Sequence, residues 1–224
     1  DYIPVNSPNN LLEGCERKLS DDFKYLFETK KNCDITIKVG DKEFKAHKFI
    51  LTARSCVFEA MFSYDMKENK ENEVTIPDID PDVFKKVLDY IYTDKVEDLI
   101  SFAESLLEAA DKYQLFGLKN LCEYSLSKTL SPGNAMRILI LADCHYAKRL
   151  VAVAIDFIAK NWIKFKNTKE FKQLEKFHTS LAYAVVKKYA DGVDKKLWPV
   201  FCRSFSRSWI KITCSVIFYT LYTL

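Results

Sequence analysis

Apolar positions change their spacing several times in the first third of the chain, and each change predicts a new element. From Leu19 they recur at helical intervals, which predicts a short amphipathic helix with one apolar stripe. Residues 35–39 then alternate between apolar and polar, as half-buried strands do. Gly40-Asp41 predicts a turn into a second strand that contains Phe44. A helix followed by a β-hairpin is therefore expected here.

The pattern becomes mainly helical after the hairpin. Residues 48–62, KFILTARSCVFEAMF, are too long and too mixed for a strand and predict two short helices broken near Ser55. Residues 74–76 predict a short strand that ends at Pro77. Further helices are expected around residues 81–92, 99–110, 118–126, 132–141, 150–158 and 181–190.

Ser131-Pro132 marks the most visible boundary in the helical part. Serine is a frequent helix cap and proline a frequent first helical residue, so this pair predicts a helix that starts at Pro132. The order of elements predicts a mixed α+β unit followed by an all-α unit, with the seam near residues 129–132. The expected parts are a tail at 1–16, the mixed domain at 17–129, helices at 130–190 and a divergent hydrophobic tail at 191–224.

Charge and cysteine content argue against a nucleic-acid-binding protein and against a secreted, disulfide-bonded one. The net charge is only +3 and both signs are interspersed, so we expect no nucleic-acid surface. Seven cysteines, an odd number, are spread widely and no signal-peptide-like start is visible, which favours a reducing, intracellular setting.

Catalysis, metal binding and cofactor binding are not expected. The chain has three histidines, no CxxC or HxxxH spacing and no Gly-rich phosphate loop. His47 is interpreted as a packing or buried polar residue at a strand end. Cys144-His145 is the only Cys-His neighbour pair, and we expect Cys122 and Cys144 to be ordinary core thiols on apolar helical faces.

Several short sequence motifs, spaced along the chain, resemble those of a known family. They are Cys33-Asp34, residues 44–48 (FKAHK), 50–62, Ile91-Tyr92-Thr93, 109–113 (AADKY) and 138–143 (ILILAD). Over roughly residues 17–165 the chain resembles a BTB (POZ) domain followed by the beginning of a BACK domain. The motifs resemble the speckle-type POZ protein group of cullin-3 adaptors more closely than the kelch-repeat group. The resemblance implies a BTB/POZ fold, a small mixed sheet flanked by helices, followed by a BACK-like all-α region.

The resemblance also implies a homodimer. The stripe of Leu19, Phe23 and Leu26 has few local partners, because only a hairpin follows it, although its own domain could cover it. In the family this helix crosses to a second subunit and meets the residue that corresponds to Ile50.

Asp34 and Lys48 are charged residues within otherwise hydrophobic motifs. The resemblance places them close together near the dimer interface. In some BTB proteins this region is a charged pocket for partners. A salt bridge at a strand end is the simpler interpretation, and we favour it.

The polar segment SYDMKENKENE, residues 63–73, contains one methionine. Cullin-binding BTB domains carry an apolar residue, any residue and glutamate at this position, and Met66-Lys67-Glu68 supplies that pattern. Met66 would be an adaptable apolar contact and Glu68 would fix the register. The residues assigned to cullin binding are Met66, Glu68, Phe62, Tyr64 and Tyr92. The alternative is a solvated loop with an exposed methionine.

The predicted function is a homodimeric adaptor, itself no enzyme, that joins cullin-3 to an unknown substrate protein in the nucleus or cytoplasm. The speckle-type group normally has a MATH domain ahead of the BTB domain, whereas only a short tail precedes Leu19 here. The alternative is a truncated BTB protein without ligase output, either an inhibitor of full-length relatives or a repressor scaffold. A membrane tether would rest on residues 209–224 alone, a run shorter than the ~20 apolar residues of a spanning helix. We therefore expect a packed or poorly ordered tail there and no membrane anchor.

Overall fold

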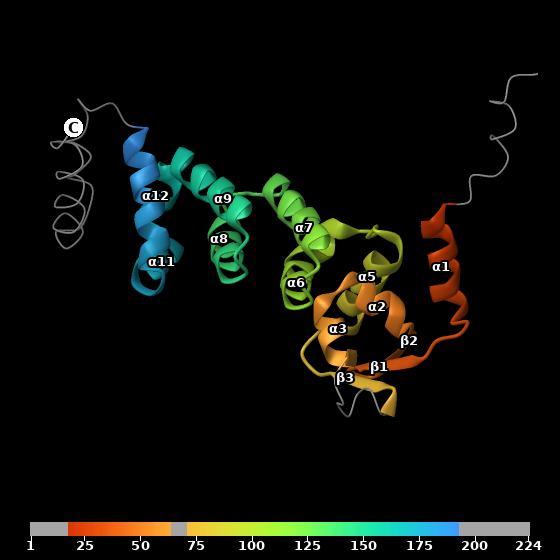
Figure 1. Cartoon of the computed structure of the whole chain (residues 1–224). Helices are drawn as coiled ribbons and strands as arrows, with labels where there is room; N and C mark the ends of the chain where they lie inside the picture. The colour runs from red at the N-terminus through yellow and green to blue at the C-terminus, as the bar shows by residue number, and fades with distance from the viewer. Residues whose placement is uncertain (1–17, 64–70, 193–224) are drawn as a thin grey trace, which may run out of the picture. The chain divides into compact units, whose positions relative to one another are not determined.

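The computed structural model of the chain describes residues 18–63 and 71–192 (Figure 1). These residues belong to two compact units. The first unit runs to Thr129 and includes residues 141–150, and the second contains residues 130–140 and those from 151 onward. The two predicted tails and the segment with Tyr64, Met66 and Glu68 lie outside the described residues.

The first unit contains a three-stranded mixed sheet. The strands are β1 (Ile35–Val39), β2 (Lys42–Ala46) and β3 (Glu73–Ile76), in the order β2-β1-β3. β1 pairs antiparallel with β2 and parallel with β3, which confirms the predicted hairpin and the short third strand. Gly40 has a φ of 57°, so it suits the two-residue turn between β1 and β2.

Among the described residues, this unit has six helices: α1 (Leu19–Thr29), α2 (Lys48–Arg54), α3 (Cys56–Ser63), α5 (Pro81–Thr93), α6 (Leu99–Lys112) and α7 (Phe116–Lys128). The core between them contains stacked aromatic rings. The Phe58 ring lies 4.7 Å from that of Tyr113, and Phe84 meets Tyr113 edge to face. All three side chains are almost fully buried.

The predicted break between α2 and α3 is confirmed at Ser55. Its hydroxyl donates to the Tyr113 carbonyl oxygen at 2.7 Å and accepts from the Phe58 N–H at 3.3 Å. The Ser55 side chain therefore caps the start of α3 and also ties the turn to the end of α6. α5 begins as predicted, with Pro81 as its first residue. The Asp80 carboxylate accepts the N–H groups of Asp82 and Val83.

The remaining helices lie in residues 130–192, of which residues 141–150 belong to the first unit and the others to the second. The chain continues with α8 (Ala135–Cys144), α9 (Lys148–Lys160), α10 (Trp162–Phe165), α11 (Lys169–Phe177) and α12 (Thr179–Asp191). The buried Trp162 ring contacts Phe171 edge to face and stacks on Tyr189. The last helix predicted from the sequence lies within α12.

One helix start was predicted wrongly. α8 begins at Ala135, three residues after Pro132. The Ser131 N–H donates to the Asn134 side-chain oxygen at 2.7 Å, and the Ser131 carbonyl accepts from the N–H groups of Asn134 and Ala135. This local bonding makes residues 132–134 a turn, and the helix starts only after it.

Candidate protein-interaction surface

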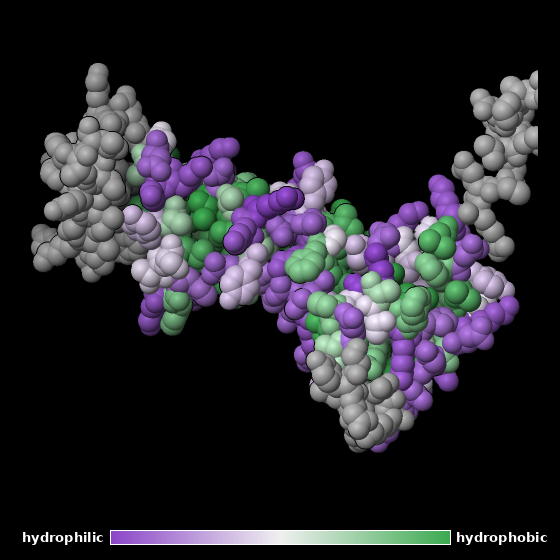
Figure 2. All heavy atoms as spheres, viewed as in Figure 1, coloured by the Kyte–Doolittle hydropathy of each residue, from purple (hydrophilic) through white to green (hydrophobic). Residues whose placement is uncertain are grey.

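The predicted dimer stripe is carried by α1. None of its residues is buried, and Leu19 is 68% exposed, whereas Phe23 and Leu26 are half-buried. Apolar surface is visible on this helix in Figure 2. α1 packs on α5, where the Phe27 ring stacks on Tyr92 at 4.7 Å. The helix therefore packs on α5, and its apolar stripe stays accessible at Leu19 and in part at Phe23 and Leu26.

α2 contributes the exposed apolar residue Phe49, which was not predicted from the sequence. Phe49 is 81% exposed, whereas Ile50, which was predicted to lie at the interface, is 9% exposed and is mostly covered by its own unit. A signal was present in the sequence. Phe49, Ile50 and Leu51 are consecutive, and three consecutive helical positions cannot all face one core. Phe49 is thus the exposed apolar side chain of this helix.

The structure places Asp34 beside the backbone of Lys48. An Asp34 carboxylate oxygen accepts the backbone N–H of Lys48 at 2.7 Å. Lys48 is the first residue of α2, and the preceding His47 gives no side-chain cap, so the carboxylate at the start of β1 caps the helix instead. The Lys48 ammonium donates to the Asn72 side-chain oxygen at 2.6 Å.

His47 forms hydrogen bonds to two other segments of the first unit, through Lys31 and Tyr92. Its Nε2 lies 2.7 Å from the Lys31 carbonyl, which can only accept, so Nε2 carries the hydrogen. Nδ1 then accepts from the Tyr92 hydroxyl at 2.8 Å, and that hydroxyl oxygen accepts the His47 N–H at 3.0 Å. Burial raises the pKa of Tyr92 and of the nearby Cys33 thiol. This network joins the end of α1 to the β2–α2 junction and to α5, in line with the polar role predicted for His47.

Two of the five residues assigned to cullin binding can be placed. Phe62 is 7% exposed and stacks on Phe58, and Tyr92 is 2% exposed and bonded to His47. Both side chains are thus used within the unit. Tyr64, Met66 and Glu68 lie outside the described residues. The predicted contact therefore rests mainly on the segment that follows α3.

A groove of about 860 Å³ lies beside α1, along β2 and α5 and up to the segment 93–99. Its lining is mixed, with five lysines and six acidic residues around Phe27, Phe44 and other apolar side chains. Burial raises the pKa of the half-buried Asp89 on α5, although Lys85 and Lys86 oppose the shift. The mixed lining gives the groove no strong preference for one sign of charge.

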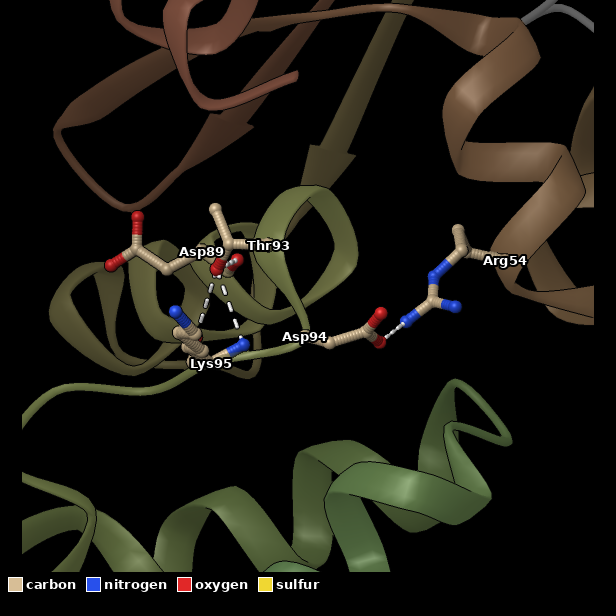
Figure 3. Close-up of polar contacts among 5 residues, drawn as sticks. All are labelled: Arg54, Asp89, Thr93, Asp94 and Lys95. Atoms are coloured by element: carbon tan, nitrogen blue, oxygen red, sulfur yellow. Dashed lines mark hydrogen bonds and ion pairs between the residues drawn. The ribbon is translucent and has the colours of Figure 1, made fainter. Parts of the chain in front are cut away.

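Figure 3 shows how the end of α5 is fixed at the border of this groove. Asp94 ends the helix in the left-handed conformation, and its carboxylate pairs with Arg54 of α2. The Thr93 hydroxyl donates to the Asp89 carbonyl at 2.6 Å and accepts the Lys95 N–H at 3.2 Å. These contacts hold the turn that leaves α5 against the first unit.

The cysteines differ in exposure. Cys122 is fully buried, as expected, and burial raises its pKa to about 12. The expectation of a second core thiol was wrong, because Cys144 is exposed. It is the last residue of α8, and an apolar helical pattern no longer reports burial at a helix end. Across residues 18–63 and 71–192, no group of three or more His, Cys, Asp or Glu side chains is arranged to hold a metal ion.

His145, next to Cys144, belongs to a charged cluster that the sequence analysis missed. Asp111 lies 2.5 Å from the Lys119 ammonium and 3.3 Å from His145 Nδ1, and Lys119 also donates to the His145 carbonyl at 2.5 Å. Burial alone would raise the pKa of Asp111, but the bonds from Lys119 and His145 outweigh it and lower that pKa. The cluster fastens the α8–α9 turn to the α6–α7 turn.

None of the helices in the described parts of the chain has both the length and the apolar character needed to cross a membrane. The hydrophobic run at 209–224 lies outside those parts.

One family model matches a large part of the first unit. The family model of the BTB/POZ domain matches residues 23–130, from the second turn of α1 to just beyond α7. Among solved structures, the chain is similar to the BTB domain of zebrafish PATZ1, with 23% identity and a TM-score of 0.44. That likeness covers 57% of this chain and 100% of the other. The mixed sheet with its surrounding helices is a BTB fold, and BTB domains are modules for dimerisation and protein–protein interaction. Residues 23–130 of this chain therefore form a BTB/POZ domain.

Proposed function

We propose that the chain is a dimeric BTB adaptor that binds cullin-3 and positions a substrate protein for ubiquitination, as in the speckle-type POZ group. The observation that carries the proposal is the word Met66-Lys67-Glu68, which follows α3 inside a BTB/POZ domain. Phe62 anchors the end of α3 in the core, so the chain leaves the domain at a fixed point only four residues before Met66.

The two side chains of this word have complementary chemistry. A methionine is unbranched and polarisable, so it adapts to a shallow apolar pocket on a partner helix. The carboxylate of Glu68 pairs with a donor on the partner and fixes the register of the contact. Lys67 lies between them and has no assigned contact.

The adaptor itself breaks and forms no bonds. It raises the effective concentration of a substrate near the ligase, and a dimer would do so twice in one particle. In this proposal Leu19, Phe23, Leu26 and Ile50 form the shared apolar interface, and we add the exposed Phe49 because Ile50 is largely covered by its own unit. The helices at 130–190 are the beginning of a BACK domain, and the substrate is a protein that the sequence does not identify.

The test is a titration of the cullin-3 N-terminal domain against the full chain and three variants. Loss of a central apolar contact typically costs about 2 kcal/mol, roughly a thirtyfold loss of affinity. Met66→Ala and Glu68→Ala should each weaken binding by about that factor. Lys67→Ala is the matched control and should bind like the unmodified chain.

Equal affinities for all four proteins would contradict the proposal. The non-ligase scaffold would then be the better description of the chain. An equal loss at Lys67→Ala would show that only the charge of the segment matters.

A further inference from the structure

β2 is an edge strand. Among the described residues, β1 pairs with one side of it and no strand lies on the other. Of its five residues, Lys42, Glu43 and Lys45 are exposed and Phe44 is half-buried. An edge of this kind presents unpaired backbone groups to any strand that can approach it.

The register of the hairpin determines which backbone groups face outward. Val39 and Lys42 flank the two-residue turn and are partners, so they form a hydrogen-bonded pair. Bonded and non-bonded pairs alternate along an antiparallel ladder, which directs Phe44 and Ala46 toward β1 as well. The N–H and C=O groups of Glu43 and Lys45 therefore point to the free edge.

This edge is complementary to itself. If two copies of β2 pair antiparallel about a two-fold axis at Phe44, Glu43 of one copy lies opposite Lys45 of the other. These are the two residues whose backbone groups face outward, so each opposed pair makes both hydrogen bonds and places opposite charges side by side. The two Phe44 side chains meet at the axis, on the other face of the sheet.

We propose that the β2 edge pairs with the β2 edge of a second copy, which joins two sheets into one of six strands. Charges on an edge strand often prevent such pairing. Here they favour it in one register, because each Glu43 faces a Lys45. The groove of about 860 Å³ lined by residues 43–45 supplies open space beside the strand.

The pairing is distinct from the α1 interface and independent of cullin-3 binding. Five residues per strand bury little area, which places the contact with small, transient interfaces, below ~1,200 Å² in total. Two different two-fold contacts on one chain generate an open chain of dimers. The edge would therefore act as a weak contact between adaptor dimers.

The experiment is sedimentation equilibrium over a wide concentration range, in a Leu26→Asp background that removes the α1 contact. The background protein should associate weakly to dimers. Glu43→Lys and Lys45→Glu each place like charges opposite one another and should abolish association. The double variant Glu43→Lys/Lys45→Glu restores opposite charges and should associate again. Lys45→Pro removes an outward N–H, at an edge position where proline is tolerated, together with the lysine charge, and should also abolish association.

Circular dichroism establishes that each variant is folded before its mass is compared. A background protein that stays monomeric at every concentration would overturn the proposal. So would single reversals that associate as well as the background, or a double variant that stays monomeric. Because no step measures cullin-3 binding, failure here leaves the adaptor proposal unaffected.

Discussion

Gly117 is the position at which one added methyl group should do most damage to the first unit. It is the second residue of α7, and a Cβ there would overlap the Tyr90 hydroxyl oxygen and lie 3.3 Å from the Tyr90 ζ carbon. Tyr90 is only 8% exposed, and the Arg54 guanidinium lies over its ring at 5.5 Å. The ring therefore cannot move away without disturbing the Arg54–Asp94 pair beside the groove.

Two effects of Gly117→Ala oppose each other. Alanine in a helix is about 1 kcal/mol more favourable than glycine. Overpacking of a buried site costs about 1–3 kcal/mol. The substitution should thus lower the free energy of unfolding by up to about 2 kcal/mol in the unmodified chain. In a Tyr90→Phe background the overlapping oxygen is gone, and the same substitution should raise that free energy by up to about 1 kcal/mol.

The assay is urea unfolding of the four proteins of this double-mutant cycle, followed by circular dichroism. Hydrogen exchange of peptides from α5 and α7 separates the first unit from the second. A change of sign between the two backgrounds is the expected result. The same effect of Gly117→Ala in both would refute the role given to the Tyr90 hydroxyl.

Three further measurements address the rest of the chain. Leu26→Asp should convert a dimer to a monomer in light scattering, whereas Lys24→Asp on the polar side of α1 should not; a wild-type chain that is already monomeric would refute the α1 interface. Asp80→Ala should lower the midpoint of urea unfolding, at a cost of about 1 kcal/mol, because two N–H groups of α5 lose their acceptor, and Asp80→Asn should retain most of it. Burial raises the pKa of Cys122 to about 12, so this thiol should stay protonated and unreactive toward a thiol reagent at pH 8 until the chain unfolds. The exposed Cys56 is the control and should react at once. Fast modification of Cys122 in the folded chain would contradict its burial.

Elements that depend on local pattern were predictable from the sequence. The alternation at 35–39 and the glycine of the turn were enough for the hairpin, because both signals lie within a few residues. The break at Ser55 was also predictable. Its physical partner, the Tyr113 carbonyl 58 residues away, was not, since no local pattern encodes a contact of that range.

The site shows the same division. The resemblance implied that Asp34 and Lys48 lie together, but the contact is a carboxylate on a helix N–H, which depends on how α2 starts. The exposure of Cys144 and the start of α8 at Ala135 depend on helix ends, where a periodic pattern carries least information. The Lys119–Asp111–His145 cluster joins residues from two helices and a turn, and single charged residues in a sequence give no sign of such a grouping.

The attachment of α1 links these observations to self-association. An isolated helix of eleven residues is marginal in water, and α1 has no buried residue to compensate. Two of its contacts lie near its C-terminal end, where Phe27 stacks on Tyr92 and the following Lys31 carbonyl accepts from His47. A second copy that covers Leu19, Phe23 and Leu26 would supply the burial that this helix lacks. Tyr92 directly precedes Thr93 and Asp94, which line the groove beside β2. A second copy that covers α1 would therefore also stabilise this side of the groove, through the stacking of Phe27 on Tyr92.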